Sequence, residues 1–430
     1  MEVQSHDRDL IVTDEDAKIF SLKAAEFLNA TFVALDEENK IYRLVMPNKI
    51  DYLDITNPIA NSIEKDLKRR DLTINSVAVN LRNFEIVDLT GGINDIKNKI
   101  IRHISEQNLI DDPLRLLRIF RFQAIYGFDT DLDTVNLVKK YSNLILNPAV
   151  ERINYELIRL FSGKYSHIAL LNMDKSDILE KIFPFAKELK LVPPNTHHHL
   201  RLLEHCIETV KQIQSIYENS ADDVKYHLQK TDFGGQPRLA FLKLSGFLHD
   251  IGKYSTWTVE GDRHRFIKHD DVGSKLVKPF LKNMHFSNKQ TEYISLMVKN
   301  HIYPASVVSA PIVNEKIMMR YLRKMEESAI DAIILAEADR LSALGPQITD
   351  EIVKDNIENL ERLLNFCIEK SKTLKPLPKL LDGKEIMKIL NIKPSKNLGI
   401  ILKKLHEAQI SGDITSKEHA IEFVKNLKLD

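Results

Sequence analysis

Glycine and proline, the two residues that most often interrupt regular structure, are scarce in this sequence. The 430 residues contain 14 glycines and 15 prolines, so long helices should dominate the fold. The first ninety or so residues are the exception, because short β-branched or aromatic runs alternate there with one helical stretch at 17–28. These runs are LIV (10–12), ATFVAL (30–35), IYRLVM (41–46), KIDYLDI (49–55) and FEIVDL (84–89). The pattern predicts a small N-terminal α/β unit, with Thr13 and Asp14 capping its helix.

From about residue 96 the apolar residues recur every three or four positions, which is the period of amphipathic helices. The helical runs lie at 113–128, 151–161, 200–217, 238–252, 291–302 and 316–344. Prolines at 193–194, 304, 311, 376 and 378 mark candidate boundaries. The sequence therefore predicts an α+β protein, in which a small α/β head precedes a mostly α-helical body.

Composition excludes several classes of protein. Lys and Arg number 61, as do Asp and Glu, so any nucleic-acid surface must be a local patch on a neutral chain. Two cysteines, Cys206 and Cys367, are too few for a disulfide framework or a thiolate zinc site. No run of about 18 apolar residues is present, and the acidic N-terminus lacks the pattern of a signal peptide. We therefore expect a cytoplasmic protein with no membrane span and no disulfide partner.

The first polar cluster, Asp7-Arg8-Asp9, runs into an apolar strand. Two carboxylates at positions i and i+2 of a strand point to the same face, which suits a divalent cation. Asp51, on a later strand, is a candidate third acid. A metal held in this way stabilises the attacking oxygen and the leaving pyrophosphate in nucleotidyl transfer. Taken alone, the pattern is also typical of an ordinary acidic surface.

The second cluster is Arg69-Arg70-Asp71. Guanidinium groups bind phosphate, and a carboxylate accepts hydrogen bonds from ribose hydroxyls. The cluster therefore suits a nucleotide, although the same residues also fit the charged start of a helix.

The third cluster is Asp111-Asp112, followed by Arg115, Arg118 and Arg121 on one predicted helix. Asp112 and Arg115 are three residues apart, so they should share a helical face. A carboxylate beside a guanidinium can hydrogen-bond the edge of a base. Acidic residues at the positive end of a helix are an alternative explanation for the two aspartates, but that explanation leaves the arginines without a role.

The order of the three clusters resembles a known family. The segments DRDLIV (7–12), LKRRDLTINSVAVNLRNFEIVDLTGGINDIKNKIIR (67–102), DDPLRLLRIFRFQAIYGF (111–128) and ERINYEL (151–157) are similar to the bacterial tRNA nucleotidyltransferase (CCA-adding) and poly(A) polymerase family. The resemblance continues into the tail at 380–424, so it covers nearly the whole chain.

The resemblance implies specific roles. Asp7 and Asp9 would hold catalytic Mg²⁺, while Asp112 and Arg115 would select CTP or ATP in place of a nucleic-acid template. The nucleotide-binding residues implied are Arg70, Asp71, Asp112, Arg115, Arg118 and Arg152, with Arg152 and Glu156 bracing the template helix.

Two departures from the family pattern stand out. Asp111 occupies a position where the family usually has Glu. The family also places a glycine-rich turn, G-G-x-x-R-D, before its D-x-D, whereas here no glycine precedes Gly91 and six residues precede Asp7. In the family this turn cradles the triphosphate. The pattern leaves open whether the start of the chain is displaced or the transferase half is inactive.

The histidines in the helical middle form a second pattern, H…HD…H…H…D, on successive predicted helices. Its members are His205, His249, Asp250, His269, His301 and Asp339. The order resembles the HD phosphohydrolase superfamily, and imidazole with carboxylate suits a divalent metal that supplies hydroxide for attack on phosphate. Lys253 could neutralise phosphate charge. Structural histidines are the alternative, and His197–His199 should form a loop or a helix start rather than a ligand set.

A lysine-rich segment lies near the C-terminus. Residues 366–404 contain ten lysines against three acidic residues, a local basic stripe typical of phosphate binding. A solvated helical face is the alternative. The family resemblance favours binding of the tRNA acceptor arm and elbow, recognised by shape and 3′ end.

We therefore expect a nucleotidyltransferase head (1–95), a helical neck with the base-selecting motif (96–165), an HD domain (166–350) and a tRNA-binding C-terminal region (351–430). The expected function is template-independent addition of C and/or A to the tRNA 3′ end, with tRNA, CTP and ATP as partners, and an HD phosphohydrolase activity that uses a divalent metal. One alternative is an HD phosphohydrolase with an inactive transferase remnant, and another is a non-catalytic tRNA-binding protein.

Overall fold

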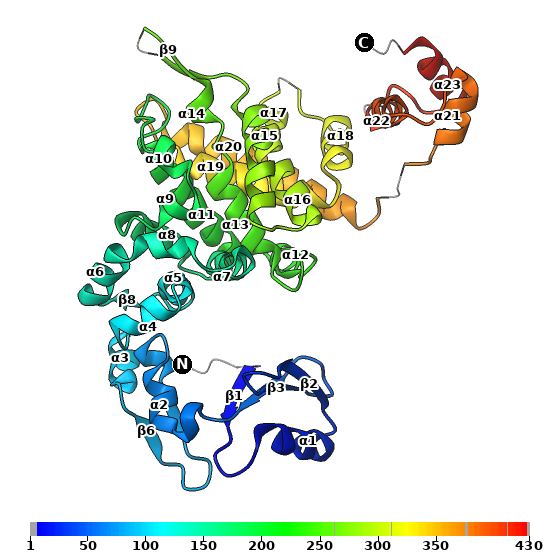
Figure 1. Ribbon diagram of the computed structural model, residues 1–430. Coiled ribbons are helices and arrows are strands. Elements are labelled where there is room, and N and C mark those ends of the chain that lie inside the picture. The colour runs from blue at the N-terminus through cyan, green and yellow to red at the C-terminus, as the bar shows by residue number, and fades with distance from the viewer. Residues whose placement is uncertain (1–6, 262, 311, 375–376, 411, 428–430) are drawn as a thin grey trace. The chain divides into compact units, whose positions relative to one another are not determined.

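The computed structural model describes residues 7–427 except 262, 311, 375–376 and 411. The chain forms two compact units (Figure 1). The first contains the residues up to Ile119 together with Phe128–Leu144, and the second contains Phe120–Gly127 and the residues from Ile145 onward. The expected architecture, an α/β head followed by a mostly helical body, is confirmed.

A four-stranded sheet with strand order β1-β4-β3-β2 opens the first unit. Its elements are β1 (Asp7–Ile11), α1 (Ala17–Leu28), β2 (Thr31–Asp36), β3 (Ile41–Val45) and β4 (Tyr52–Thr56). Strands β1 and β4 are parallel, and the other pairs are antiparallel. Helix α1 packs on the sheet, and their shared core includes Ala17, Ala25, Tyr42, Leu44 and Ile55.

The predicted helix at 17–28 has those bounds in the structure, but its predicted cap is wrong. The carboxylate of Asp16, rather than Thr13 or Asp14, accepts a hydrogen bond from the Lys18 N–H at 2.9 Å. Asp16 is the residue directly before the first helical position, and from there its side chain reaches the free N–H groups of the first turn.

The rest of the first unit is built from short elements. They are α2 (Ile63–Lys68), β5 (Val77–Val79), β6 (Ile86–Asp88), α3 (Gly92–Asn98), β7 (Ile100–Ile101), α4 (Glu106–Asp111), β8 (Asp129–Thr130) and α6 (Leu132–Lys140). Helix α5 (Leu114–Tyr126) contributes its first half to this unit and its second half to the other.

The second unit is a helical body. Its elements as far as residue 371 are α7 (Val150–Ser162), α8 (Ser166–Lys175), α9 (Leu179–Ile182), α10 (Ala186–Leu189), α11 (Leu202–Asn219), α12 (Asp222–Gln229), α13 (Arg238–Leu248), α14 (Lys253–Thr256), β9 (Trp257–Glu260), β10 (Arg263–Phe266), α15 (His269–Asn283), α16 (Asn288–Asn300), α17 (Tyr303–Val308), α18 (Glu315–Met325), α19 (Ala329–Ser342) and α20 (Asp350–Ser371). Every residue of α13 is buried, which explains its nearly continuous apolar sequence.

The structure corrects two expectations for this body. The run 316–344 is not one helix, because Glu326 adopts φ 48° between α18 and α19. The antiparallel hairpin β9–β10 was not predicted, since the region after residue 96 was expected to be helical.

A buried carboxylate joins four helices of the body. Asp331 on α19 accepts from Arg238 Nε and from Tyr293 Oη at 2.7 and 2.6 Å, and its other oxygen lies 2.7 Å from His227 Nε2. These partners lie on α13, α16 and α12. The network satisfies the charge of Asp331. It fixes α19, which carries Asp339, against α13, which ends two residues before Asp250.

The chain ends in α21 (Gly383–Leu390), α22 (Lys396–Ile410) and α23 (Lys417–Asn426). These helices have a separate apolar core that includes Ile386, Ile401, Leu405, Ala420 and Val424. In the described part of the chain, no helix is long and apolar enough to cross a membrane. Both cysteines are buried and free.

Candidate functional sites

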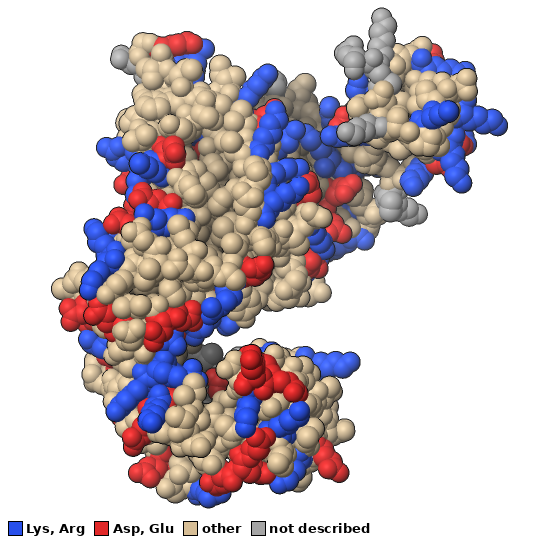
Figure 2. All heavy atoms as spheres, in the orientation of Figure 1, with Lys and Arg blue, Asp and Glu red and all other residues tan. Residues whose placement is uncertain are grey.

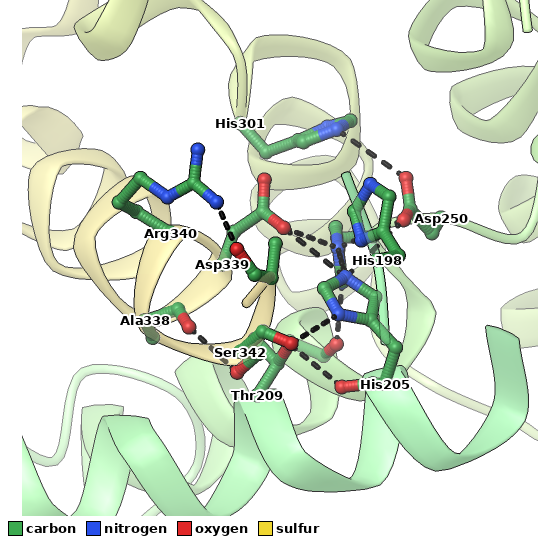
Figure 3. Close-up of polar contacts among 12 residues, drawn as sticks. His198, His205, Thr209, Asp250, His301, Ala338, Asp339, Arg340 and Ser342 are labelled. Atoms are coloured by element: carbon green, nitrogen blue, oxygen red, sulfur yellow. Dashed lines mark hydrogen bonds and ion pairs between the residues drawn. The ribbon is translucent and has the colours of Figure 1, made fainter. Parts of the chain in front are cut away.

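The residues of the H…HD…H…H…D pattern converge inside the helical body (Figure 3). They form two groups of candidate metal ligands, His205, His249, Asp250 and Asp339 in one and Asp250, His269 and His301 in the other. Asp250 belongs to both groups. The ligand atoms within each group lie within 4.8 Å of one another, so the predicted ligand residues are brought together in space.

The distances place Asp250 between the two groups. Its Oδ2 lies 3.2 Å from His249 Nε2 and 3.5 Å from His205 Nε2. Its Oδ1 lies 3.2 Å from His269 Nε2 and 3.6 Å from His301 Nε2. One carboxylate therefore presents one oxygen to each pair of histidines.

The other nitrogen of each histidine faces a backbone carbonyl. The Nδ1 atoms of His249, His269 and His301 lie 2.7, 2.8 and 2.7 Å from the carbonyl oxygens of Gly246, Phe266 and Val298. Nδ1 must carry the proton to donate there, so Nε2 keeps its lone pair for a metal.

The facing Nε2 atoms support a cation site. The Nε2 atoms of His205 and His249 lie 3.3 Å apart, and those of His269 and His301 lie 3.2 Å apart. Two bare lone pairs at this distance repel unless a proton or a cation lies between them. Neutral imidazoles with two carboxylates are a donor set that suits divalent transition metals, so the residues fit such an ion.

The electrostatics of the cluster favour charged carboxylates. Burial raises the pKa of Asp250, but His249 and Lys253 hold it well below its usual range. The pKa of Asp339 is lowered in the same way by His205 and His249. Burial lowers the pKa of His249, but the charges of Asp250 and Asp339 raise it to about 10. A metal competes with that proton for Nε2.

One residue near this cluster was not identified from the sequence as functional. The run His197–His199 forms a loop before α11, as expected, but His198 turns toward the cluster (Figure 3). Its Nε2 lies 3.4 Å from Lys253 Nζ, and its ring lies edge-on to that of His205, with centroids 4.7 Å apart. The only feature of the sequence that could have indicated a role for His198 is its position seven residues before His205.

In the head, strand pairing identifies a second acid beside Asp9. The parallel register pairs Asp9 on β1 with Asp54 on β4, and paired residues of a sheet point to the same face. Asp54 is held by Arg43, whose Nε and Nη2 donate to its two oxygens at 2.7 and 2.6 Å. Asp7 lies on β1 two residues before Asp9, and its side chain lies outside the described residues.

The expectation that Asp51 is the third acid is wrong. Asp51 precedes β4, and its carboxylate accepts from Asn48 Nδ2 at 2.6 Å within a turn. The acid in register with Asp9 is Asp54, three residues later.

Asp71 of the second polar cluster contacts Arg118 of the third. Asp71 is buried, and Arg118 Nε donates to its Oδ2 at 2.6 Å. Its Oδ1 accepts from Asn75 Nδ2 at 3.0 Å. Burial raises the pKa of Asp71, but Arg118 and Asn75 hold it below its usual value. Arg70 is fixed nearby, since its Nη1 donates to Asn75 O at 2.8 Å.

Asp112 and Arg115 do not share a helical face, contrary to expectation. Asp112 has φ −134° and ψ 89° and lies between α4 and α5. Arg115 is in the first turn of α5, its N–H donates to Asp112 O at 3.0 Å, and its Nη1 donates to Asn108 O at 3.1 Å. The break arises because α5 begins after Pro113, and the residue before a proline disfavours the helical conformation.

The ERINYEL segment lies on α7. Glu156 is buried and its Oε2 lies 3.1 Å from Arg121 Nε on α5, so the expected brace of the α5 helix by Glu156 is present. Arg152 is exposed in the first turn of α7.

Comparison with known proteins identifies three domain models along the chain. Family models match a poly(A) polymerase head domain at residues 5–102, a probable RNA- and SrmB-binding site of polymerase A at 127–190, and an HD domain at 202–344. The A-adding tRNA nucleotidyltransferase of Deinococcus radiodurans is 28% identical over 432 residues, covering 98% of this chain and 92% of the relative. The CC-adding tRNA nucleotidyltransferase of Thermus thermophilus is 27% identical, covering 97% and 91%.

Solved structures share the fold. The Thermotoga maritima CCA-adding enzyme complexed with tRNA has a TM-score of 0.53 and 19% identity, covering 98% of this chain and 87% of that chain. A CCA-adding enzyme complexed with CTP has a TM-score of 0.55. The matched domains, the relatives that align over nearly the whole chain and the converging motifs agree, and the chain belongs to the tRNA nucleotidyltransferase and poly(A) polymerase family as a member with an HD domain.

Proposed function

We propose that this protein adds C and/or A nucleotides to the 3′ end of tRNA without a nucleic-acid template and releases pyrophosphate. The observation that carries the proposal is the placement of Asp9 and Asp54 on one face of the sheet, in a head whose relatives act on tRNA. The proposed nucleotide-binding residues are Arg70, Asp71, Asp112, Arg115, Arg118 and Arg152, with CTP and ATP as the nucleotides.

The tRNA 3′ hydroxyl attacks the α-phosphate, so the new phosphorus–oxygen bond forms as the bond to pyrophosphate breaks. Asp9 and Asp54 would hold Mg²⁺ together with Asp7, the other acid of β1, and the ion would stabilise the attacking and leaving oxygens. Arg43 keeps the Asp54 carboxylate in place. Arg118, held by Asp71, and Arg115 orient the incoming nucleotide, and base choice rests on their hydrogen-bond donors.

The test uses purified full-length protein with Mg²⁺, CTP, ATP and tRNA trimmed at its 3′ end. We expect Asp9→Asn and Asp54→Asn each to lower the rate of extension by about a thousandfold, the scale of lost stabilisation of a charged transition state. Asp51→Asn is the matched control and should keep the wild-type rate, because Asp51 binds within a turn. Absence of extension by the wild-type protein with any combination of the two nucleotides would refute the proposal.

We also propose that the HD domain hydrolyses phosphate esters or 2′,3′-cyclic phosphates. The supporting observation is the pair of ligand groups that share Asp250. A divalent metal held there would activate the water that attacks phosphorus. His205, His249, Asp250, His269, His301 and Asp339 are the proposed ligands, and Lys253 Nζ, 2.6 Å from Asp250 Oδ2, balances phosphate charge.

Single substitutions should remove one of the two proposed activities and leave the other. Asp250→Ala should abolish hydrolysis of p-nitrophenyl phosphate and lower the bound metal measured by mass spectrometry, while tRNA extension continues. Asp9→Asn should do the reverse. Unchanged hydrolysis in Asp250→Ala would exclude this site, and hydrolysis without any extension by the wild-type protein would favour a phosphohydrolase with an inactive head.

For tRNA binding we propose the C-terminal region, residues 351–430, following a head at 1–95, a neck at 96–165 and an HD domain at 166–350. Several basic side chains project from the visible surface of α21–α23 (Figure 2). Lys384, Lys388, Lys393, Lys403 and Lys404 are exposed there. With this tRNA-processing role we also propose a cytoplasmic location.

A further inference from the structure

A short loop before α11 forms one edge of the HD ligand cluster. This loop, residues 194–199, is called the rim loop below. Gly345 N–H donates to His197 O at 2.9 Å, which attaches the rim loop to the chain after α19. Inside the loop, Asn195 Oδ1 accepts from the N–H groups of His197 and His198 at 2.9 and 3.1 Å. The backbone that carries His198 is therefore fixed at both of these points.

The contact with Gly345 is very close. A Cβ at this glycine would lie 2.3 Å from the carbonyl carbon of His197 and 2.5 Å from Thr196 O. Only a residue without a side chain permits this approach. The rim loop thus packs directly on the segment that follows Asp339, one of the proposed ligands.

His198 turns inward from the rim loop and contacts the ammonium of Lys253. Lysine has only donors, so Lys253 donates to His198 Nε2 at 3.4 Å and to Asp250 Oδ2, at 2.6 Å. Among the described residues these are its two polar partners, which leaves one of its three ammonium hydrogens for a ligand. His198 is thus a neutral second acceptor that holds Lys253 beside the cluster.

His198 and Lys253 line a small pocket that also includes His205 and has room for about one water molecule. Because His205 belongs to the first ligand group, the pocket adjoins the proposed metal centre. A space of this size beside the Lys253 ammonium suits a water molecule or a single phosphoryl oxygen.

We propose that His198 and Lys253 form the subsite of the HD centre that binds the phosphoryl group of the ester, with His198 as a positioning residue for the Lys253 ammonium. The inference rests on the phosphohydrolase function proposed above. Lys253 binds a phosphoryl oxygen. On hydrolysis the water oxygen bonds to phosphorus, the phosphorus–oxygen bond to the organic part breaks, and a proton from water ends on the leaving alcohol.

The test compares His198→Phe, which keeps a flat ring without nitrogen, with His198→Gln, which restores an acceptor. His197→Phe is the matched control, since that side chain is exposed on the same loop. In full-length, metal-loaded protein we expect His198→Phe to weaken inorganic phosphate binding in calorimetry, and to raise KM for p-nitrophenyl phosphate, by about tenfold, the scale of one hydrogen bond to a charged group. Its kcat, metal content and Tm should remain near wild type, and His198→Gln should recover most of the affinity.

A double variant tests whether His198 acts through Lys253. If it does, adding His198→Phe to Lys253→Ala should change phosphate affinity less than twofold, because the two effects are not additive. Full additivity would overturn the positioning role, as would a wild-type phosphate affinity in His198→Phe. Loss of metal from His198→Phe would make His198 part of the metal centre instead. If the wild-type protein neither binds phosphate nor hydrolyses the ester, the HD function itself fails.

Discussion

Two buried lysines show how the charge of a hydrogen-bond acceptor determines the pKa of a buried ammonium group. Lys253 has the carboxylate of Asp250 at 2.6 Å, and although burial lowers its pKa, that charge raises it above its usual value. Lys243 is equally buried, but its Nζ donates to neutral acceptors, Gly163 O at 2.8 Å and Ser166 Oγ at 3.2 Å. Burial therefore lowers the pKa of Lys243 to about 7.

This difference predicts a pH dependence of stability. Above pH 7 Lys243 is neutral in the folded protein, whereas in the unfolded chain it stays protonated up to a pKa of about 10.4. The unfolded state therefore binds more protons, and stability should rise with pH between these values. Relative to Lys243→Met, the wild-type protein should gain about 1 kcal/mol in free energy of unfolding per pH unit from 7 to 9. Chemical denaturation of both proteins at several pH values in this range measures the difference in free energy of unfolding. A difference that does not change with pH would contradict the lowered pKa of Lys243.

At the residue scale, the convergence of the candidate metal ligands in the HD domain was predictable, because their order along the chain is itself the signal. Asp54 was not, because its role depends on the register of β1 with β4, two strands more than forty positions apart. His198 was also missed, since a loop histidine gives no periodic pattern that indicates its direction. Both residues are defined by long-range packing.

At the element scale, the close approach of two segments positions His269. A Cβ at Gly252, directly before α14, would lie 2.0 Å from His269 O and 2.7 Å from Gly273 N on α15. Both contacts are with backbone, which has no flexible end to move aside. The glycine is therefore required for α15 to present His269 to Asp250.

We expect Gly252→Ala to displace the start of α15 and separate His269 from Asp250. The protein should lose metal at the group of Asp250, His269 and His301, which mass spectrometry of dialysed protein measures as a lower metal-to-protein ratio. Gly399→Ala is the control, because a Cβ there meets nothing within 4 Å. An unchanged ratio in Gly252→Ala would show that α15 tolerates the side chain.

Elements with strong periodicity were predicted well, and elements set by tertiary contacts were not. The ranges 17–28 and 113–128 match α1 and α5 closely, because apolar spacing alone defines an amphipathic helix. The hairpin β9–β10 is only four residues per strand and alternates weakly, so it gave little signal. The break at Glu326 has no glycine or proline to mark it, and a positive φ at a glutamate requires support from packing.

At the scale of the whole molecule, zero net charge conceals an uneven distribution. Lys370 and Lys372 of the basic stripe form ion pairs with Glu315 and Asp223, at 3.1 and 2.8 Å. In contrast, Lys384, Lys388 and Lys393 are exposed and have no ion pair among the residues that the structure describes. The stripe, predicted from composition alone, therefore divides into lysines that form ion pairs with the body and lysines that form none among the described residues.

The triple variant Lys384→Gln, Lys388→Gln and Lys393→Gln should bind tRNA more weakly and with less dependence on salt. Each lost phosphate contact should reduce the slope of log affinity against log salt by about 0.7 to 0.9. Filter binding between 50 and 200 mM salt measures the slope, and hydrolysis of p-nitrophenyl phosphate should not change. Lys370→Gln with Lys372→Gln is the comparison pair, and an equal loss of slope there would contradict the division.

Because both ligand groups use the carboxylate of Asp250, substitutions in the HD centre differ in how many of the two groups they damage. Loss of His269 or Asp339 damages one group and leaves the other complete, so a lineage can keep half a centre through such a change. Loss of Asp250 removes an oxygen from both groups in a single substitution. Descendants with a reduced centre should therefore retain this aspartate for as long as they retain either half.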